Sequence, residues 1–246
     1  MELAAYSELV QQEQNHWWFI ARRAITRALL NRANLPANAA ILDAGCGSGG
    51  NLSMLASYGA VSAFEMSEFM YARAKERSIG RVEQGKLPEQ IPFANEQFDL
   101  ITMFDVLEHI ENDSAALSTL SARLKTGGKM LITVPAFGWL FSRHDQLHHH
   151  FRRYSRRELQ TKLQNSGLEI ELINYWNCLL FPVAVATRLV DFLISKVSKG
   201  QNTIGTKTPA PPINKLLAKL VSAEKFIIPR LPLPCGLSLV VVARKK

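Results

Sequence analysis

Short apolar runs alternate with segments of helical spacing along most of this chain, a pattern that predicts a layered α/β fold. Strands are expected at residues 39–42, 61–65, 98–104, 129–135, 168–175 and 237–243, with a shorter one around 81–83. Helices are expected at residues 2–34, 51–56, 66–77, 114–124 and 155–163. Buried strands joined through helices are typical of a mostly parallel sheet.

The first predicted strand is followed by Asp43, a glycine-rich run at 44–50 and then a helical segment. This order is the layout in which a nucleotide-like ligand meets the N-terminus of a helix. Glycine suits such a turn because it adopts positive φ and lets a ligand approach the backbone. The second predicted strand ends at Glu65, about 20 residues further on, where an acid can bind ribose hydroxyls. The chain is therefore predicted to bind an adenosine-containing cofactor.

Two families of enzymes fit the glycine turn. Gly45, Gly47 and Gly50 satisfy the pattern G-x-G-x-x-G, so an NAD-dependent oxidoreductase is one interpretation. Four segments, however, resemble the class I S-adenosylmethionine (SAM) dependent methyltransferases, in that family's order. They are D-A-G-C-G-S-G at 43–49, I-P-F-A-N-E-Q-F-D at 91–99, F-D-V-L-E-H-I at 104–110 and L-K-T-G-G-K-M-L-I-T-V-P at 124–135. These four matches favour a methyltransferase.

The resemblance implies a Rossmann-like, doubly wound α/β fold. Its seven-stranded sheet would be mostly parallel, with the last strand antiparallel beside the fifth. We expect a helical lid at residues 1–36 and a SAM-binding domain at 37–246, with a helical insertion at about 177–234 before the last strand. The chain of 246 residues, 47% of them hydrophobic, is long enough for one such core.

The resemblance also implies how SAM, the expected cofactor, would be bound. The backbone at 45–49 would cradle its methionine part, Glu65 would bind the ribose and Met66 would pack on the adenine. Arg22 would pair with the methionine carboxylate, unless Trp17 and Phe19 only anchor this helix to the core and the arginine stays solvated. The Phe104 carbonyl would accept a hydrogen bond from the ammonium. The expected cofactor-binding residues are Arg22, Asp43, Gly45, Cys46, Gly47, Gly49, Glu65, Met66, Leu87 and Phe104. One departure is Lys86, which stands where many relatives have an acid and cannot accept a bond from adenine.

The acceptor side is expected in the loop at residues 142–154, which contains four histidines and emerges where ligands of open α/β sheets gather. An oxygen acceptor needs a base, and histidine fits that role. We expect His144, its pKa raised by Asp145, to be this base, with His109 as a second catalytic candidate. His149, Arg153 and Tyr154 are the expected acceptor-binding residues.

Blander interpretations of this loop stay open. A run of histidines is also typical of a solvated surface, and the spacing of His144, Asp145 and His148 is compatible with a metal site. No metal is expected.

The net charge of +8 and a pI of about 9.5 raise the question of a nucleic-acid partner. The basic residues lie in separate places, however, and Phe104-Asp105-Val106-Leu107 replaces the Asn/Asp-Pro-Pro-Tyr/Phe motif of enzymes that methylate base amines. An anionic small molecule or membrane surface explains the charge as well. Three scattered cysteines indicate neither a disulfide framework nor a zinc site. The N-terminus lacks the profile of a signal peptide, so we expect a cytoplasmic protein, peripheral on the membrane at most.

Two amphipathic helices are predicted in the insertion, at about 176–199 and 213–228. In the first, Thr187, Asp191 and Ser195 share one face. The second has an apolar stripe interrupted by Glu224. These helices could cap the acceptor pocket, lie on a membrane or pack on a second copy of the chain.

The predicted function is SAM-dependent methyl transfer to an oxygen of a small or lipid-linked acceptor. The alternatives are an NAD-dependent oxidoreductase and a non-catalytic binding protein of the same fold.

Overall fold

A single seven-stranded sheet forms the centre of the protein. The computed structural model describes residues 3–187 and 208–246. The strands are β1 (Ala39–Ala44), β2 (Gly59–Glu65), β3 (Arg81–Gln84), β4 (Phe98–Phe104), β5 (Leu124–Pro135), β6 (Leu168–Trp176) and β7 (Ser238–Lys245), in the order β3-β2-β1-β4-β5-β7-β6. Strands β1 to β5 are parallel, whereas β7 is antiparallel to both β5 and β6. The predicted Rossmann-like sheet, with its antiparallel last strand beside the fifth, is confirmed.

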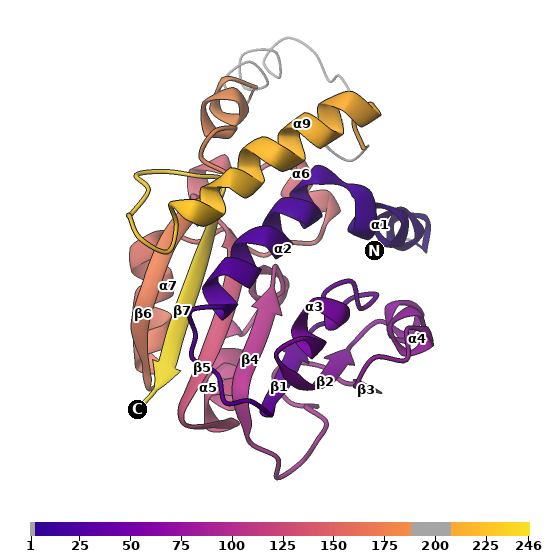
Figure 1. Ribbon diagram of the computed structural model, residues 1–246, viewed down its shortest axis with the longest axis vertical. Helices are drawn as coiled ribbons and strands as arrows, with labels where there is room; N and C mark the ends of the chain where they lie inside the picture. Colours follow the sequence, from indigo (N-terminus) through magenta and orange to yellow (C-terminus); the bar gives the residue numbers. More distant parts are fainter. Residues whose placement is uncertain (1–2, 188–207) are drawn as a thin grey trace.

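Helices cover both faces of this sheet (Figure 1). They are α1 (Leu3–Asn15), α2 (Trp17–Leu30), α3 (Leu52–Ala56), α4 (Glu68–Glu76), α5 (Asp113–Ala122), α6 (Arg143–Leu147), α7 (Arg156–Asn165) and α9 (Pro211–Ser222), with 3-10 turns η1 (Leu107–His109), η2 (Gly138–Leu140) and η3 (Ala223–Phe226). Residues 181–187 are helical too. Because side chains alternate along a strand, the sheet contributes to two cores. One core lies against α5 and α7, and the other against α2, α3, α4 and α9.

Two predicted boundaries were wrong for local reasons. The expected single helix at 2–34 is two helices, because the His16 ring accepts a hydrogen bond from the Trp18 N–H at 3.2 Å and caps α2. The helix expected to reach Leu124 ends at Ala122. Leu124 instead begins β5, pairing with Phe98 ahead of an irregularity in the register.

The second insertion helix, α9, buries a different face from the apolar one. Its buried residues are Asn214, Ala218 and Val221, whereas Ile213 and Leu216 are 54% and 56% exposed. The cause is Asn214, whose amide accepts a bond from the Trp17 N–H at 2.8 Å and donates to the Asn15 carbonyl at 2.7 Å. This bridge fixes α9 on the junction of α1 and α2. Of the residues predicted to share one face of the first insertion helix, Asp191 and Ser195 lie outside the described residues.

Glu224 interrupts the apolar stripe because its carboxylate binds the backbone of the segment that follows β6. Its buried carboxylate accepts hydrogen bonds from the backbone N–H groups of residues 177, 178 and 179, at 2.6, 2.8 and 3.3 Å. A carboxylate that satisfies three backbone donors in this way holds the insertion to the end of the sheet.

We predict that Glu224→Ala lowers the free energy of unfolding by about 3 kcal/mol, because buried backbone donors lose a charged acceptor. Urea unfolding followed by circular dichroism measures this change. Glu89→Ala, at an exposed turn position, is the matched control and should unfold like the parent protein. A Glu224→Ala protein as stable as this control would show that the cap contributes nothing.

Candidate active site

The glycine turn after β1 has a backbone conformation that requires glycine. Gly45, Gly47 and Gly49 have φ of +77°, +57° and +82°, values that side chains rarely adopt. A Cβ on Gly45 would lie 2.8 Å from the Val106 side chain, whereas a Cβ on Gly47 would meet nothing within 4 Å. Gly45 therefore permits close packing against the end of β4, and the backbone at Gly47 is accessible to a ligand. Cys46 is buried, and burial raises the pKa of its thiol far above the ordinary value, which makes it a packing residue.

Glu65 stands at the end of β2, beside this turn. Its carboxylate accepts hydrogen bonds from the Gly47 N–H at 3.0 Å and the Ser67 N–H at 2.9 Å, and burial raises its pKa. The next side chain, Met66, is 57% exposed, and Leu87 is buried. The acid expected at the ribose is thus hydrogen-bonded to the turn expected at the methionine part.

Asp43 carries a buried carboxylate oxygen that has no partner among the described residues. Its other oxygen accepts a hydrogen bond from the Thr102 hydroxyl at 2.6 Å. Burial raises the pKa of this carboxyl group to about 6. A buried, unpartnered carboxylate oxygen at the end of β1 suits a positively charged ligand group such as the ammonium of SAM.

Arg22 reaches the carboxyl end of β4 from α2. Its Nη1 donates to the Phe104 carbonyl at 3.2 Å and to the Asp105 carboxylate at 2.7 Å. The guanidinium carbon lies 4.6 Å from the centroid of the Trp18 ring and 5.2 Å from that of Phe19. The aromatic run and the arginine of the predicted lid therefore form one unit at this edge. The expected contacts of Arg22 and Phe104 with SAM stay predictions.

Glu13, a residue that the sequence analysis missed, joins α1 to the glycine turn. Its carboxylate accepts a hydrogen bond from the Gly50 N–H at 3.0 Å, contacts the Ser48 hydroxyl and pairs with Arg77 at 3.2 Å. A glutamate within a helix carries no motif, so no signal in the sequence could have identified it.

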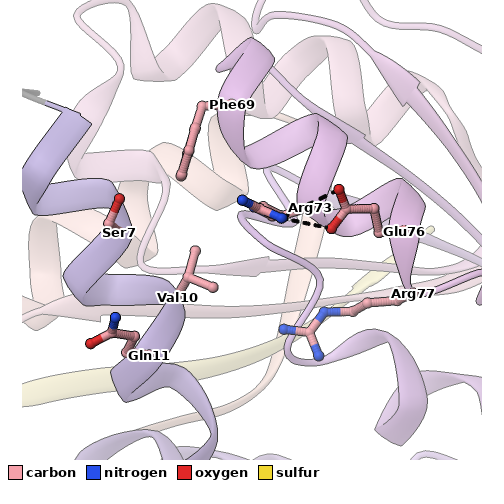
Figure 2. Close-up of a pocket in the computed structure, with 7 residues that line it drawn as sticks. All are labelled: Ser7, Val10, Gln11, Phe69, Arg73, Glu76 and Arg77. Carbon is pink, nitrogen blue, oxygen red and sulfur yellow. Dashed lines mark hydrogen bonds and ion pairs between the residues drawn. The ribbon is translucent and has the colours of Figure 1, made fainter.

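A hollow of about 460 Å³ lies between α1 and α4 (Figure 2). It is lined by Ser7, Val10, Gln11, Phe69, Arg73, Glu76 and Arg77. None of the expected cofactor-binding residues lines it, so we do not assign it to the cofactor.

No hydrogen bond joins the expected pair of His144 and Asp145, although the charge of Asp145 acts to raise the pKa of His144 as predicted. The buried Asp145 carboxylate instead contacts His150 Nδ1 at 2.9 Å, Arg153 Nε at 2.8 Å and the Ser142 N–H at 2.8 Å. Burial would raise the pKa of Asp145, but the hydrogen bond from His150 and the charge of Arg153 hold it well below its usual range. The pKa of His144 is lowered to about 4 by burial, with His148 adding to the effect, so His144 is a neutral imidazole at pH 7.

His109 lies at the end of η1, opposite the loop that contains His150. The two ring centroids are 4.6 Å apart and the rings are nearly perpendicular. Burial, together with the neighbouring histidines, lowers the pKa of His109 to about 3. The structure therefore brings His109 and the histidine loop together at the carboxyl edge of the sheet, although through His150 rather than His144.

Two of the three expected acceptor-binding residues are engaged elsewhere. Tyr154 is fully buried, and its hydroxyl donates to Asp113 at 2.8 Å and to the Leu107 carbonyl at 3.2 Å, so it supports η1 instead of an acceptor. Arg153 is bonded to Asp145 and to the Ala136 carbonyl. His149 is exposed, and nothing in the structure tests its expected role.

An aromatic cluster extends from the ends of β5 and β6. Phe137 stacks on Tyr175 with ring centroids 5.1 Å apart, and it contacts Trp139 and Phe181 at 5.7 and 5.3 Å. Trp139 remains 63% exposed. These four residues, hereafter the aromatic cluster, form an apolar surface at the sheet edge from which the histidine loop also emerges.

Comparison with known proteins identifies the family. Residues 16–173 match the family described as Methyltransferase domain. Two curated relatives, both named ubiquinone biosynthesis O-methyltransferase, come from Coxiella burnetii and Xanthomonas axonopodis pv. citri. The first is 30% identical over 145 residues, 54% of this chain and 60% of that protein, and the second is 27% identical over 184 residues, 64% and 77%. The match therefore spans less than two thirds of the Coxiella relative.

A solved structure shares the fold. The S-adenosylmethionine dependent methyltransferase from Mesorhizobium loti superposes with a TM-score of 0.57 at 18% identity, covering 88% of this chain and 96% of that one. At this level of identity the likeness concerns the fold alone.

We predict that SAM binds about tenfold more weakly at pH 5 than at pH 7, because its ammonium favours ionised Asp43, whose pKa is about 6. Below this pKa the protein must lose a proton to bind, so affinity falls as the pH falls. Calorimetric titration at both pH values measures the effect. Asp43→Asn should bind weakly at both values, with this part of the pH dependence removed. An unchanged pH profile in that variant would contradict the assignment.

Proposed function

Because this chain belongs to the methyltransferase domain family, we propose that it transfers a methyl group from SAM to an oxygen of an acceptor with a large apolar part. Family membership decides between the two interpretations of the glycine turn, in favour of the methyltransferase. The observation that carries the acceptor class is the aromatic cluster, which lies beside a histidine loop at the carboxyl edge of the sheet. Apolar rings suit an aromatic or isoprenoid group, and neutral histidines suit a hydroxyl.

The names of the curated relatives support the same class of acceptor. Both are called ubiquinone biosynthesis O-methyltransferases, a name that implies methyl transfer to an oxygen of a quinone precursor. We therefore propose a phenolic or catecholic hydroxyl on a ring that bears a lipid-like substituent.

The chain's own residues divide the work as follows. SAM, when bound, supplies an electrophilic methyl group on a sulfonium. The glycine turn, Asp43 and Glu65 would hold it, because the empty space beside the Cα of Gly47 and the unpartnered oxygen of Asp43 fit such a ligand. The aromatic cluster would position the acceptor ring, and the histidine loop would present neutral imidazoles, among them His144, to the hydroxyl.

We further propose that α1 and α2 form a lid over the bound cofactor. Arg22 of α2 lies at the end of β4, and Glu13 of α1 lies on the glycine turn. Both helices thus contact the edge at which the cofactor would sit, and closing them excludes water from the reaction.

An apolar, positively charged surface on α9 and the segment after it, residues 223–231, supports a membrane-proximal acceptor. Ile213, Leu216 and Leu220 are each at least 43% exposed, and Phe226 and Leu231 are 65% and 62% exposed. Lys215, Lys219 and Arg230 are exposed beside them. Among the described residues no helix is both long and apolar enough to cross a bilayer. Exposed apolar groups flanked by lysine suit an anionic lipid surface, which would bring a lipid-linked acceptor to the enzyme.

The proposed reaction is tested with labelled SAM and phenols or catechols with and without an isoprenoid chain. We expect label on a hydroxyl oxygen and faster transfer to the isoprenoid-bearing acceptors.

Glu65→Ala should weaken SAM binding at least about 50-fold, because two ribose hydroxyls lose a carboxylate acceptor. Glu68→Ala, an exposed acid on α4, is the matched control and should bind normally. SAM binding without transfer to any hydroxyl would overturn the proposed acceptor class.

Vesicle flotation tests the α9 surface. The parent protein should bind vesicles that contain phosphatidylglycerol and not those of phosphatidylcholine alone. The double variant Leu216→Asp, Leu220→Asp should lose most of this binding, since both side chains are exposed. Thr161→Asp, Gln164→Asp adds the same charge on exposed positions of α7 and should bind normally. A parent protein that binds no vesicles and is dimeric in solution would assign the surface to a second copy of the chain.

A further inference from the structure

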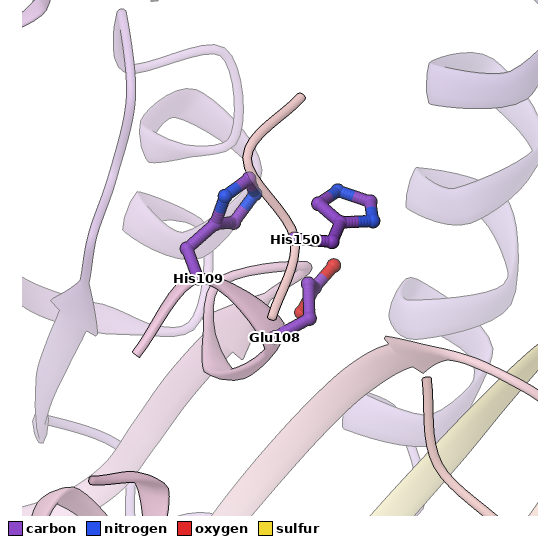
Figure 3. A group of neighbouring side chains, drawn as sticks. All are labelled: Glu108, His109 and His150. Carbon is purple, nitrogen blue, oxygen red and sulfur yellow. The ribbon is translucent and has the colours of Figure 1, made fainter. Parts of the chain in front are cut away.

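Three side chains from two separate segments converge beside the expected acceptor position. Glu108 and His109 belong to η1, and His150 follows α6 some 40 residues later. One ligand atom from each lies within 4.8 Å of the other two. Figure 3 shows the Glu108 carboxylate directed from η1 toward the His150 ring, and the His109 ring lies to the left of both in this view. Two ligands bound to one ion at about 2.1 Å lie up to about 4.2 Å apart, so small side-chain rotations suffice.

Glu108 is the member that demands an explanation. It has no exposed surface, and neither of its carboxylate oxygens has a hydrogen-bond partner among the described residues. The charges of Arg22 and Arg153 act on Glu108, but these arginines donate to Asp105 and Asp145 instead. A buried carboxylate without a partner costs several kcal/mol, and a cation bound between it and the two histidines would offset that cost.

The two histidines are oriented as metal ligands are. His150 Nδ1 contacts the Asp145 carboxylate at 2.9 Å, which leaves its Nε2 available. The His109 ring lies close to the backbone of His149, which would orient it in a similar way. A ligating histidine almost always has such a partner on its second nitrogen, and a carboxylate is one of the commonest. Asp145 therefore orients a ligand and is not itself one.

We propose that Glu108, His109 and His150 bind a divalent first-row transition-metal ion. Two imidazoles and one carboxylate suit Zn²⁺, Fe²⁺ or Mn²⁺ and not Ca²⁺ or Mg²⁺, which prefer oxygen ligands. Three protein ligands leave coordination positions open, and His109 and His150 are both partly exposed.

The position of this cluster suggests what the open positions take. Val106, immediately before η1, packs on Gly45 of the glycine turn, and the Phe151 N–H donates to the Glu108 carbonyl at 2.8 Å. The cluster thus lies where the histidine loop meets the segment that packs on the glycine turn. Resting on the proposed function, we infer that the ion binds the acceptor oxygen and favours loss of its proton, as a Lewis acid does.

Titration of the metal-free full-length protein with Co²⁺ tests the site without SAM or acceptor. Tetrahedral or five-coordinate Co²⁺ absorbs visible light, so binding is seen directly and Zn²⁺ should displace it. We expect one equivalent to bind, with at least about 100-fold weaker affinity in Glu108→Gln and in His150→Gln. His149→Gln removes an adjacent exposed histidine and should bind Co²⁺ like the parent. Circular dichroism and SAM binding establish that each variant is folded.

The outcomes separate this site from the proposed reaction. Absence of saturable Co²⁺ binding, or equal binding by the parent, Glu108→Gln and His150→Gln, would overturn the metal site whatever the methyl-transfer assay shows. Loss of binding in His149→Gln alone would place the ion elsewhere in the loop and overturn it too. A change in the Co²⁺ spectrum on adding a catechol would support the role in acceptor binding, and an unchanged spectrum would overturn that role alone.

Discussion

The ion pair between Arg22 and Asp105 is the contact on which the edge of the sheet depends. Asp105 follows β4 directly and has a φ of +57°, and its carboxylate also accepts a bond from Thr133 of β5 at 2.7 Å. Arg22 thereby joins α2 to two adjacent strands at 6% side-chain exposure. Removing either partner would leave a charge in an apolar setting made by Trp18 and Phe104. The pair therefore determines where α2 lies relative to the end of β4, beside the candidate cofactor site.

Much of this architecture could be predicted from the sequence because its causes are local. The strands bury apolar runs, the glycine turn requires positive φ, and the helix predicted from residue 155 begins there, with Ser155 as its cap. Glu65 and Asp43 were proposed as cofactor-binding residues because each stands at or next to the end of a strand beside that turn, and these roles stay predictions. Such features depend on neighbours within a few residues, and a linear sequence displays them.

The rest depends on contacts between residues far apart in the chain. Glu13 meets Gly50, and His150 meets His109, across 37 and 41 positions with no intervening motif. In the histidine loop, the prediction paired Asp145 with His144 because they are adjacent in the sequence. The Asp145 carboxylate instead contacts the His150 ring. The exposed face of α9 could not be foreseen either, because a single amide, Asn214, determines which side of the helix is buried.

That amide has a consequence for how such proteins diversify. Asn214 bonds to the backbone on both sides of the break between α1 and α2, nearly 200 residues earlier in the chain. An insertion that contributes to the packing of the N-terminus cannot be exchanged as an independent module. Recombination that replaced either segment alone would leave backbone groups at residues 15 and 17 without this partner. The two ends of the chain should therefore be inherited together, and their residues should covary among relatives even where the sheet between them is unchanged.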